Sequence, residues 1–372
     1  MTFKSFKTLL AAGFSVLILF FSTASFAQEN EHHQAPAAEN KEEGFNASEV
    51  IFGHILDAHE FHFFSWHGSD GAEHEAAIPL PVWVYSPQRG FDFFNYSNLH
   101  HGEVHNGYKS EDGKIVAVKE DGTVDESVSL LDISPTRNVI QMILALGLLV
   151  WIMLTIAKRY KSGQGVTSAP KGLQGLLEPV VTFVRDEVAK PNLGHKYEKY
   201  LPYLLTVFFF ILINNIFGLI PGTANVTGNI AFTVVLGVIS FLVILFSSNK
   251  HFWGHIFNPP GVPGFVKPIL VLVEFLSVFI KPFALIIRLF ANMVAGHIII
   301  ICLISLIFIF AEKINPAAGW GATVLSISFT IFIYFIEVLV AFLQAFIFTM
   351  LTAVFIGQAF EGEHAHEEAH AH

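Results

Sequence analysis

The sequence predicts an all-α membrane protein. It has about five membrane helices, two of them long, strongly tilted and paired in a hairpin, and a small polar N-terminal extension. Of its 372 residues, 53% are hydrophobic and 14% are charged, with a mean hydropathy of +0.54. Soluble domains carry about 25% charged residues. The apolar residues also gather into stretches near the roughly 20 residues that a spanning helix needs.

Composition argues against several classes of protein. The single cysteine, Cys302, excludes an intrachain disulfide and a cysteine-rich metal cluster. The formal net charge is −10, and it comes largely from the first third of the chain and from the tail. An acidic balance of this kind gives no indication of nucleic-acid binding.

Residues 1–27 have the three parts of a secretory signal peptide. Lys4 and Lys7 make a basic start, an apolar core runs from Leu9 to Phe21, and Ser25-Phe26-Ala27 forms a small-x-small cleavage site. We expect cleavage after Ala27, and the alternative is an uncleaved first membrane helix.

Residues 28–135 form a polar extension rich in His, Glu, Asn and Gly, which we expect on the extracytoplasmic side. Alternating segments at Pro81–Tyr85 and Lys114–Lys119, with a turn at Asp121-Gly122, predict short strands or a hairpin. The histidines have no spacing typical of metal ligands. We therefore interpret the segment as a solvated extension without a metal site.

Three apolar segments precede the hairpin. Val139–Ala157 is the first clear span, and the basic residues that follow it indicate a cytoplasmic end. The loop 158–199 holds eight Lys or Arg, and Leu176–Val188 within it predicts an amphipathic helix at the membrane surface or a docking site for a partner. Tyr203–Ile220 and Ile230–Phe246 then cross outward and back.

A proline-rich cytoplasmic connection, 251–265, leads to two long apolar segments, Phe283–Phe310 and Gly321–Ile356. As helices they would be about 42 and 54 Å long, against a hydrocarbon core of about 30 Å. We therefore expect strong tilt. The short link 311–320 makes them an antiparallel hairpin with its turn outside. The membrane domain is thus 136–360, followed by a His- and Glu-rich cytoplasmic tail, 361–372.

Polar residues inside the hairpin fall into two facing levels. With steps counted back from the turn, His297 lies opposite Glu337, and Arg288 lies deeper, opposite Gln344. Asn292 shares the face of Arg288, four residues away. An arginine at membrane depth costs at least about 2.5–3.5 kcal/mol. Its neighbours Asn292 and Gln344 are neutral and no acid lies close along its own helix, so we expect another chain to supply a carboxylate partner.

Further polar residues qualify as channel-lining candidates. Glu274, Lys281 and Arg288 recur every seven residues with Ser277 between them, although Pro282 predicts a kink or break near Lys281. In the second span Asn214 and Asn215 add interior polarity, either for function or as interhelical hydrogen bonds.

The residues leave three other functions to weigh. A His-rich metal transporter would place ligands at i, i+4 spacing within its spans, whereas the histidines here lie almost all outside them. An intramembrane enzyme needs a nucleophile–base pair or a metal pair, and neither is visible. A free-standing proton channel is the closest alternative, but the unpaired arginine argues for an outside carboxylate.

Two motifs carry a resemblance to a known family. Arg288-Leu-Phe-Ala-Asn292-Met-Val-Ala-Gly296 resembles the arginine motif of subunit a of F-type ATP synthases. Leu343-Gln-Ala-Phe-Ile-Phe348 with Leu351-Thr352 resembles the last-helix motif of that family. Pro268, Glu274, Ser277, Lys281-Pro282, Asn215 and Leu219-Ile220-Pro221 also fit, so the resemblance covers about residues 137–358.

The resemblance implies a stator for a rotating ring of c subunits. Arg288 would draw each passing carboxylate of the ring into its ionised form and block a direct leak between two proton half-channels. Asn292 and Gln344 would position the arginine by hydrogen bonds, and His297 and Glu337 would line the outer half-channel. Some members place that acid and histidine the other way round, and some carry an acid where this chain has Gly218.

The resemblance also implies partners and a location. The partners are the c-ring subunits, the peripheral-stalk b subunits through loop 158–199, the lipid bilayer and protons, with no nucleic acid. The subunit would be non-catalytic and hold no cofactor or metal. Its place would be the bacterial cell inner membrane, with an extracytoplasmic extension and a cytoplasmic C-terminus. The choice between proton and sodium depends mainly on the ring, which is another polypeptide.

Overall fold

The computed structural model describes residues 57–67, 73–111, 113–119, 121–125, 127–163, 165, 169–220, 222–258 and 263–360. The chain divides into two compact units, and the second, residues 46–372, contains every described residue. The predicted signal peptide and the His- and Glu-rich tail lie outside the described residues.

The N-terminal part of the described chain is built from short strands, as predicted. Seven strands form three small antiparallel sheets: β1 (Glu60–His67) with β2 (Glu73–Pro79); β3 (Pro81–Ser86) between β4 (Gly90–Asn95) and β7 (Leu131–Asp132); and β5 (Tyr108–Glu111) with β6 (Lys114–Ala117). A 3-10 helix, η1 (Tyr96–Gly102), follows β4. We call residues 57–132 the β module. Its core includes Val82, Val84, Phe94 and Tyr108.

Five stretches of the described chain are helical, long and apolar enough to cross a membrane, which confirms the predicted number. They contain α3 (Arg137–Lys161), α6 (Tyr197–Gly218), α7 (Ile230–Ser247), α9 (Lys267–Lys313) and α10 (Pro316–Phe360). Shorter elements join them: α4 (Leu173–Phe183), the π-helix η2 (Val184–Ala189), α5 (Lys190–Leu193), the 3-10 turns η3 (Gly194–Lys196) and η4 (Val226–Gly228), and α8 (Lys250–Phe257).

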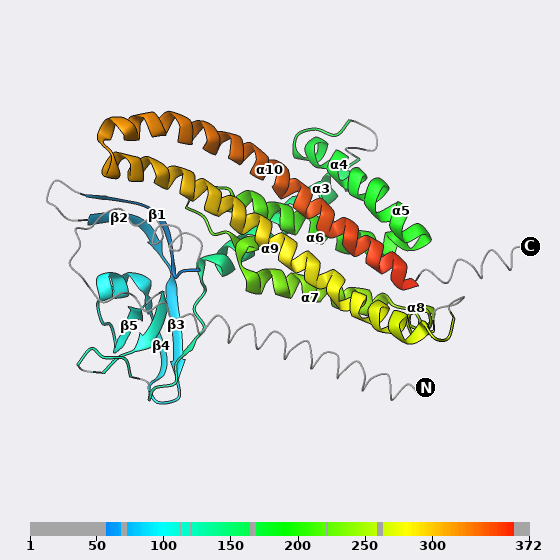
Figure 1. The fold of residues 1–372 in the computed structure, drawn as a ribbon, viewed down its shortest axis with the longest axis horizontal. Helices are drawn as coiled ribbons and strands as arrows, with labels where there is room; N and C mark the ends of the chain where they lie inside the picture. The colour runs from blue at the N-terminus through cyan, green and yellow to red at the C-terminus, as the bar shows by residue number, and fades with distance from the viewer. Residues whose placement is uncertain are drawn as a thin grey trace, which may run out of the picture. The chain divides into compact units, whose positions relative to one another are not determined.

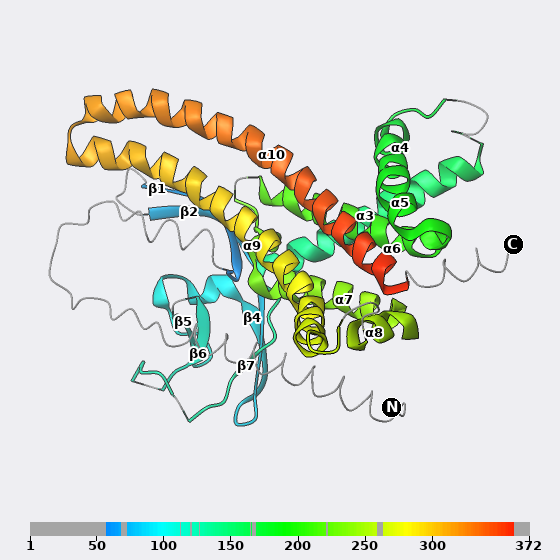
Figure 2. The ribbon, with the colours of Figure 1, turned by 45° about the vertical axis from the view of Figure 1, so that its right-hand side comes forward.

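The long helices α9 and α10 lie side by side over most of their length and form the predicted hairpin (Figures 1 and 2). They are longer than predicted, with 47 and 45 residues, or about 70 and 68 Å. Only Ile314 and Asn315 separate them. A connection this short forces the chain to reverse direction at once.

A kink or a break was predicted near Lys281, and the break is wrong, because α9 runs unbroken through Pro282. A proline inside a helix removes one backbone hydrogen bond. Here Pro282, Leu285 and Ile286 are all buried. Ile286 packs so closely on Gly237 of α7 that a methyl group there would overlap its side chain. Tight packing of α9 on its neighbours therefore offsets the cost of the proline.

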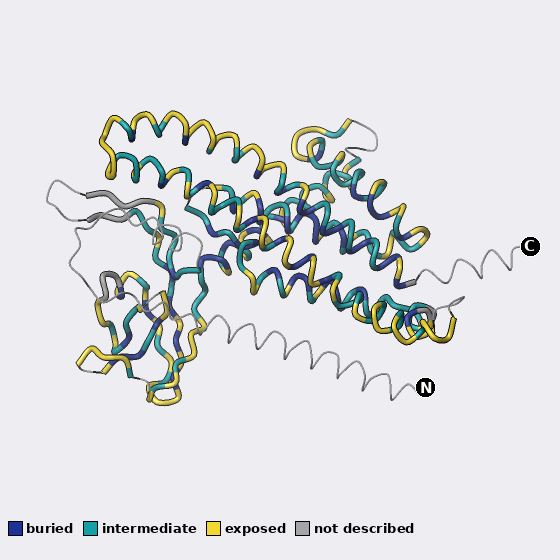
Figure 3. The backbone as a smooth tube through the Cα atoms, viewed as in Figure 1, coloured by how far each residue is buried: buried dark blue, intermediate teal, exposed yellow. Residues whose placement is uncertain are grey.

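Most buried residues lie where α6, α7, α9 and α10 pack together, whereas the ends of α9 and α10 near their turn are largely exposed (Figure 3). The segment from α4 to α5 packs on the second half of α10, where the ring of Phe183 lies 5.4 Å from that of Phe346. The predicted amphipathic helix therefore exists, with Leu176 exposed and Val184 and Val188 buried.

Candidate functional site

Arg288 lies on an exposed face of α9, although most neighbouring side chains are apolar. Within the described residues no side chain or backbone group forms a hydrogen bond or ion pair with its guanidinium. The small residues Ala284, Ala291 and Ala295 are exposed at helical spacing on the same side. The chain thus presents a free cation flanked by side chains small enough for another helix to approach closely.

Asn292 and Gln344 join the two helices of the hairpin. The Asn292 amide Nδ2 donates a hydrogen bond to Gln344 Oε1 at 3.0 Å. Gln344 is fully buried, and no described group pairs with its Nε2. The two amides therefore bond to each other, one helical turn along from Arg288, rather than to the guanidinium in the isolated chain.

Glu337 lies against the backbone of α9 at Gly296, next to His297. A Cβ atom at residue 296 would overlap the Glu337 carboxylate oxygen Oε1 and lie only 3.0 Å from its Cδ. Glu337 is buried, and its Oε2 has no hydrogen-bond partner among the described residues. His297 is half-buried. The structure therefore places Glu337 and His297 at about the same level of the hairpin.

Glu274, Ser277 and Lys281 lie on α9 itself, on the same continuous helix as Arg288. The Ser277 hydroxyl donates to the carbonyl of Glu274. The Lys281 ammonium group donates to Gln358 Oε1 at 3.1 Å and lies 5.1 Å from the ring centre of Phe355. Lys281 therefore ties α9 to the last turns of α10.

Asn214 and Asn215 are both fully buried in α6. Asn215 Nδ2 donates to the carbonyl of Ala341 in α10, whereas Asn214 Nδ2 donates within its own helix to Phe210. The Oδ1 atoms of both lack a hydrogen-bond partner in the described part of the chain. Asn215 thus reaches α10 midway between Glu337 and Gln344.

Sequence reasoning missed two polar contacts near this site. Asn225 Nδ2 donates to the carbonyl of Met293 at 3.2 Å, and its Oδ1 would lie 3.3 Å from a methyl group at Gly218. Gln141 of α3 exchanges hydrogen bonds with both backbone groups of Ala224. Both contacts join residues far apart in the chain, so no local pattern announces them.

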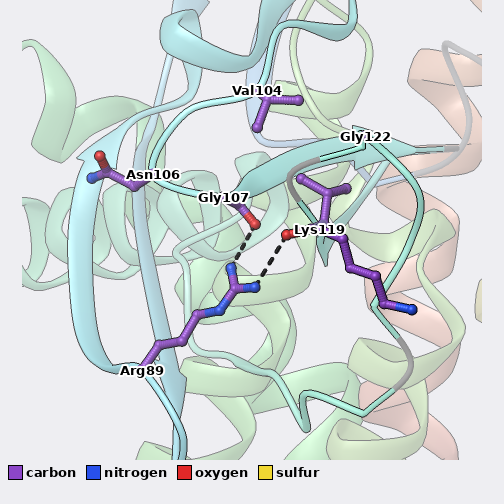
Figure 4. Close-up of a pocket in the computed structure, with 7 residues that line it drawn as sticks. Arg89, Val104, Asn106, Gly107, Lys119 and Gly122 are labelled. Carbon is purple, nitrogen blue, oxygen red and sulfur yellow. Dashed lines mark hydrogen bonds between the residues drawn. The ribbon is translucent and has the colours of Figure 1, made fainter.

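Neither the described ranges nor the site itself contains a cluster of three His, Cys, Asp or Glu side chains fit to hold a metal ion. An open pocket in the β module also contributes no chemistry to the site (Figure 4). Its Arg89 is occupied by the carbonyls of Gly107 and Val118, at 2.7 and 3.1 Å. We interpret Arg89 as a structural residue that holds the loop at Gly107 next to the chain at Val118.

Comparisons with known proteins identify the family of the chain. A family model described as "ATP synthase A chain" matches residues 139–357, and one described as a domain of unknown function (DUF8433) matches residues 50–136. The chain is 46% identical over 247 residues to "ATP synthase subunit a" of Chloroherpeton thalassium, covering 65% of this chain and 71% of the relative. It is also 46% identical over 254 residues to "ATP synthase subunit a 2" of Chlorobaculum tepidum, covering 65% and 67%. The chain therefore belongs to the ATP synthase A chain family, subunit a of F-type ATP synthases.

Proposed function

We propose that Arg288 is the point where this stator subunit meets the ionised carboxylates of the c-ring and separates two proton half-channels. One observation carries the proposal: an exposed arginine in a membrane-length helix, without a partner among the described residues. A guanidinium stays charged at any biological pH. It can therefore attract a passing carboxylate but cannot relay a proton itself.

The outer half-channel is proposed to run past His297 and Glu337. A buried carboxyl group without a hydrogen-bond partner is costly, and such costs are concentrated at functional sites. The carbonyl and amide groups that meet around Asn225 and Asn215 give this region further polarity. Support comes from the position of Glu337 against Gly296, beside His297.

The inner half-channel is proposed to follow Glu274, Ser277 and Lys281 on α9. These residues share an unbroken helix with Arg288. Lys281, the one of them nearest to Arg288, donates a hydrogen bond to Gln358 of α10. The Asn292–Gln344 bond lies between the two proposed routes. We propose that this bond fixes the spacing of α9 and α10 next to Arg288, which makes both amides positioning residues.

The chain is a multi-pass membrane protein of a bacterial ATP synthase. We propose further that the β module is extracytoplasmic and that segment 158–199 is cytoplasmic and contacts the peripheral-stalk b subunits. Leu173 and Leu176 are exposed on α4, and Asp186 forms an ion pair with Lys190 nearby. This mixture of apolar and charged groups suits a protein contact at the membrane surface.

Replacing Arg288 with alanine tests the proposal. We expect Arg288→Ala to abolish proton-driven ATP synthesis in membrane vesicles while the complex still assembles, because an exposed side chain leaves no cavity when removed. Lys313→Ala, which removes another exposed cation from the far end of α9, serves as the matched control and should synthesise normally. Coupled synthesis at a normal rate in Arg288→Ala would sink the proposal.

A further inference from the structure

The sheet formed by β4, β3 and β7 has one exposed face that is aromatic and aliphatic rather than polar. Direct antiparallel pairs place Trp83 beside Phe93 and Tyr85 beside Phe91. Together with Leu131 and Ile133 of the third strand and its extension, they form what we call the aromatic face. Its six side chains are 40–64% exposed. An antiparallel sheet with one solvated face normally carries polar residues there.

The opposite face of the same sheet is an ordinary core. Val82, Val84 and Phe94 alternate with the exposed residues, and each is at most 5% exposed. The alternation is therefore intact, and the aromatic face is not a misplaced interior. Its strand positions carry no charged side chain, because Asp92 and Asp132 point to the other side, where Asp92 accepts a hydrogen bond from Tyr108. A contiguous exposed apolar surface of this kind marks an interaction site.

The aromatic face is tied to the start of a membrane helix. The backbone N–H of Ile133 donates to the carbonyl of Trp83, so the edge of the face is fixed to the chain just before α3. Only Ser134, Pro135 and Thr136 lie between Ile133 and Arg137, the first residue of α3. At no more than about 3.6 Å per residue, Ile133 lies within about 14 Å of that helix start.

This link to α3 indicates that the lipid bilayer covers the aromatic face. The apolar part of α3, which is long enough to span a bilayer, begins directly after this link. Its first exposed apolar residues are Val139, Ile143 and Leu144. The headgroup layer on each side of a bilayer is roughly 5–8 Å thick, so a tether of at most about 14 Å keeps the Ile133 edge of the face within reach of the membrane surface. Trp and Tyr, with an apolar body and a polar tip, are the side chains enriched at that level.

We propose that the aromatic face docks the β module on the outer surface of the lipid bilayer, with Trp83, Tyr85, Phe91 and Phe93 in the headgroup layer. The β module is then held on the membrane surface next to α3. The side of the bilayer rests on the proposed extracytoplasmic location of the β module, whereas the docking itself does not depend on the role of Arg288. It gives the β module a binding function.

Spin labelling of the full chain tests the docking. The chain has a single cysteine, so Cys302→Ser gives a background without thiols. A nitroxide at Phe93→Cys reports on the face, and one at Val104→Cys, an exposed loop position of the same module, is the matched control. The labelled chain is placed in vesicles of phosphatidylethanolamine and phosphatidylglycerol, and relaxation by oxygen and by a water-soluble nickel chelate is compared.

We expect the ratio of relaxation by oxygen to relaxation by the chelate to be several-fold higher for the Phe93→Cys label than for the Val104→Cys label. Equal exposure of both labels to the chelate would overturn the docking, because the face would then lie in water. A Phe93→Cys label shielded from both reagents would also overturn it, because protein, such as a second copy, would cover the face. Phe91→Cys provides a second reporter if Phe93→Cys does not fold.

Discussion

At the scale of single residues, Gly296 decides where the Glu337 carboxyl group lies. Burial of a carboxyl group is costly unless the group forms hydrogen bonds, and for Glu337 close packing against α9 sets where the group lies. Here the absence of a Cβ at residue 296 lets the carboxyl group rest on the backbone of α9. His297 follows immediately in the chain. A glycine in the middle of a helix costs roughly 0.5–1 kcal/mol relative to alanine, so its presence at this contact fits a positional need.

Gly296→Ala should therefore displace Glu337 and lower proton-driven ATP synthesis by roughly tenfold or more, equivalent to about 1.4 kcal/mol in barrier height. The amount of chain in the membrane should stay normal, because a single methyl group leaves the rest of α9 intact. ATP synthesis in vesicles, with immunoblotting of the chain, measures both. Gly147→Ala in α3, where the new methyl group would meet nothing within 4 Å, is the control. Equal rates in the two variants would contradict the argument.

At the scale of elements, close backbone approach holds the α4–α5 segment on α10. A methyl group at Gly357 would overlap the backbone carbonyl of Asn192 in α5. Asn192 in turn donates a hydrogen bond through Nδ2 to Met350 Sδ of α10. A backbone carbonyl cannot rotate away as a side chain can. The last turns of α10 and the segment before α6 are therefore packed as one unit.

We expect Gly357→Ala to destabilise the chain by about 1–3 kcal/mol, which is typical of overpacking. The apparent melting temperature of the purified chain in detergent should fall by several degrees, at roughly 2–4 °C per kcal/mol. Gly321→Ala places the same methyl group in open space on the same helix and should not lower it. A melting temperature equal to that of the control would show that α5 does not pack there.

The β module has its own titrating group, Tyr108, whose side chain is fully buried. Burial, together with the hydrogen bond to Asp92, raises the pKa of Tyr108 from about 10 to about 12. The folded module thus holds this proton more tightly than the unfolded chain does. The resulting stability is complete below pH 10 and is lost as the pH rises through 12.

Alkaline titration should show this shift. Absorbance of phenolate in the intact chain should contain one component that ionises near pH 12 and is absent from Tyr108→Phe. Ionisation of all tyrosines near pH 10, with no difference between the two chains, would contradict the buried position of Tyr108.

Sequence reasoning predicted the elements better than their contacts. Apolar length predicted the five spans, and the short link at 311–320 predicted the hairpin. Counting back from the turn put His297 level with Glu337, whose carboxyl group lies against Gly296. Sequence reasoning placed the start of α9 at Phe283, sixteen residues late, because Pro282 and the charged residues before it do not look helical in isolation. It missed Asn225, and it expected Asn292 and Gln344 to bond to Arg288, whereas these two amides bond to each other in the isolated chain; such partners are set by helix rotation and loop packing.

At the scale of the whole molecule, the two family matches meet between residues 136 and 139, at the start of α3. The proposed role as a stator requires a surface of this chain that the ring can pass. Arg288 and the exposed alanines beside it on α9 form a charged surface of small residues. A partner helix can approach such a surface closely because no bulky side chain intervenes.

Cross-linking in the assembled complex tests this assignment. On the Cys302→Ser background, a cysteine at Ala291 should form a disulfide with a cysteine placed next to the membrane carboxylate of the c subunit. Leu144→Cys, exposed on α3, is the control and should not cross-link, because α3 would face lipid rather than the ring. Cross-linking at Ala291 should also stop ATP-driven proton pumping, and a reducing agent should restore it, since a covalent bond between stator and ring blocks rotation. Comparable cross-linking at Leu144 would place the ring on another face of the chain and remove Arg288 from the path of its carboxylates.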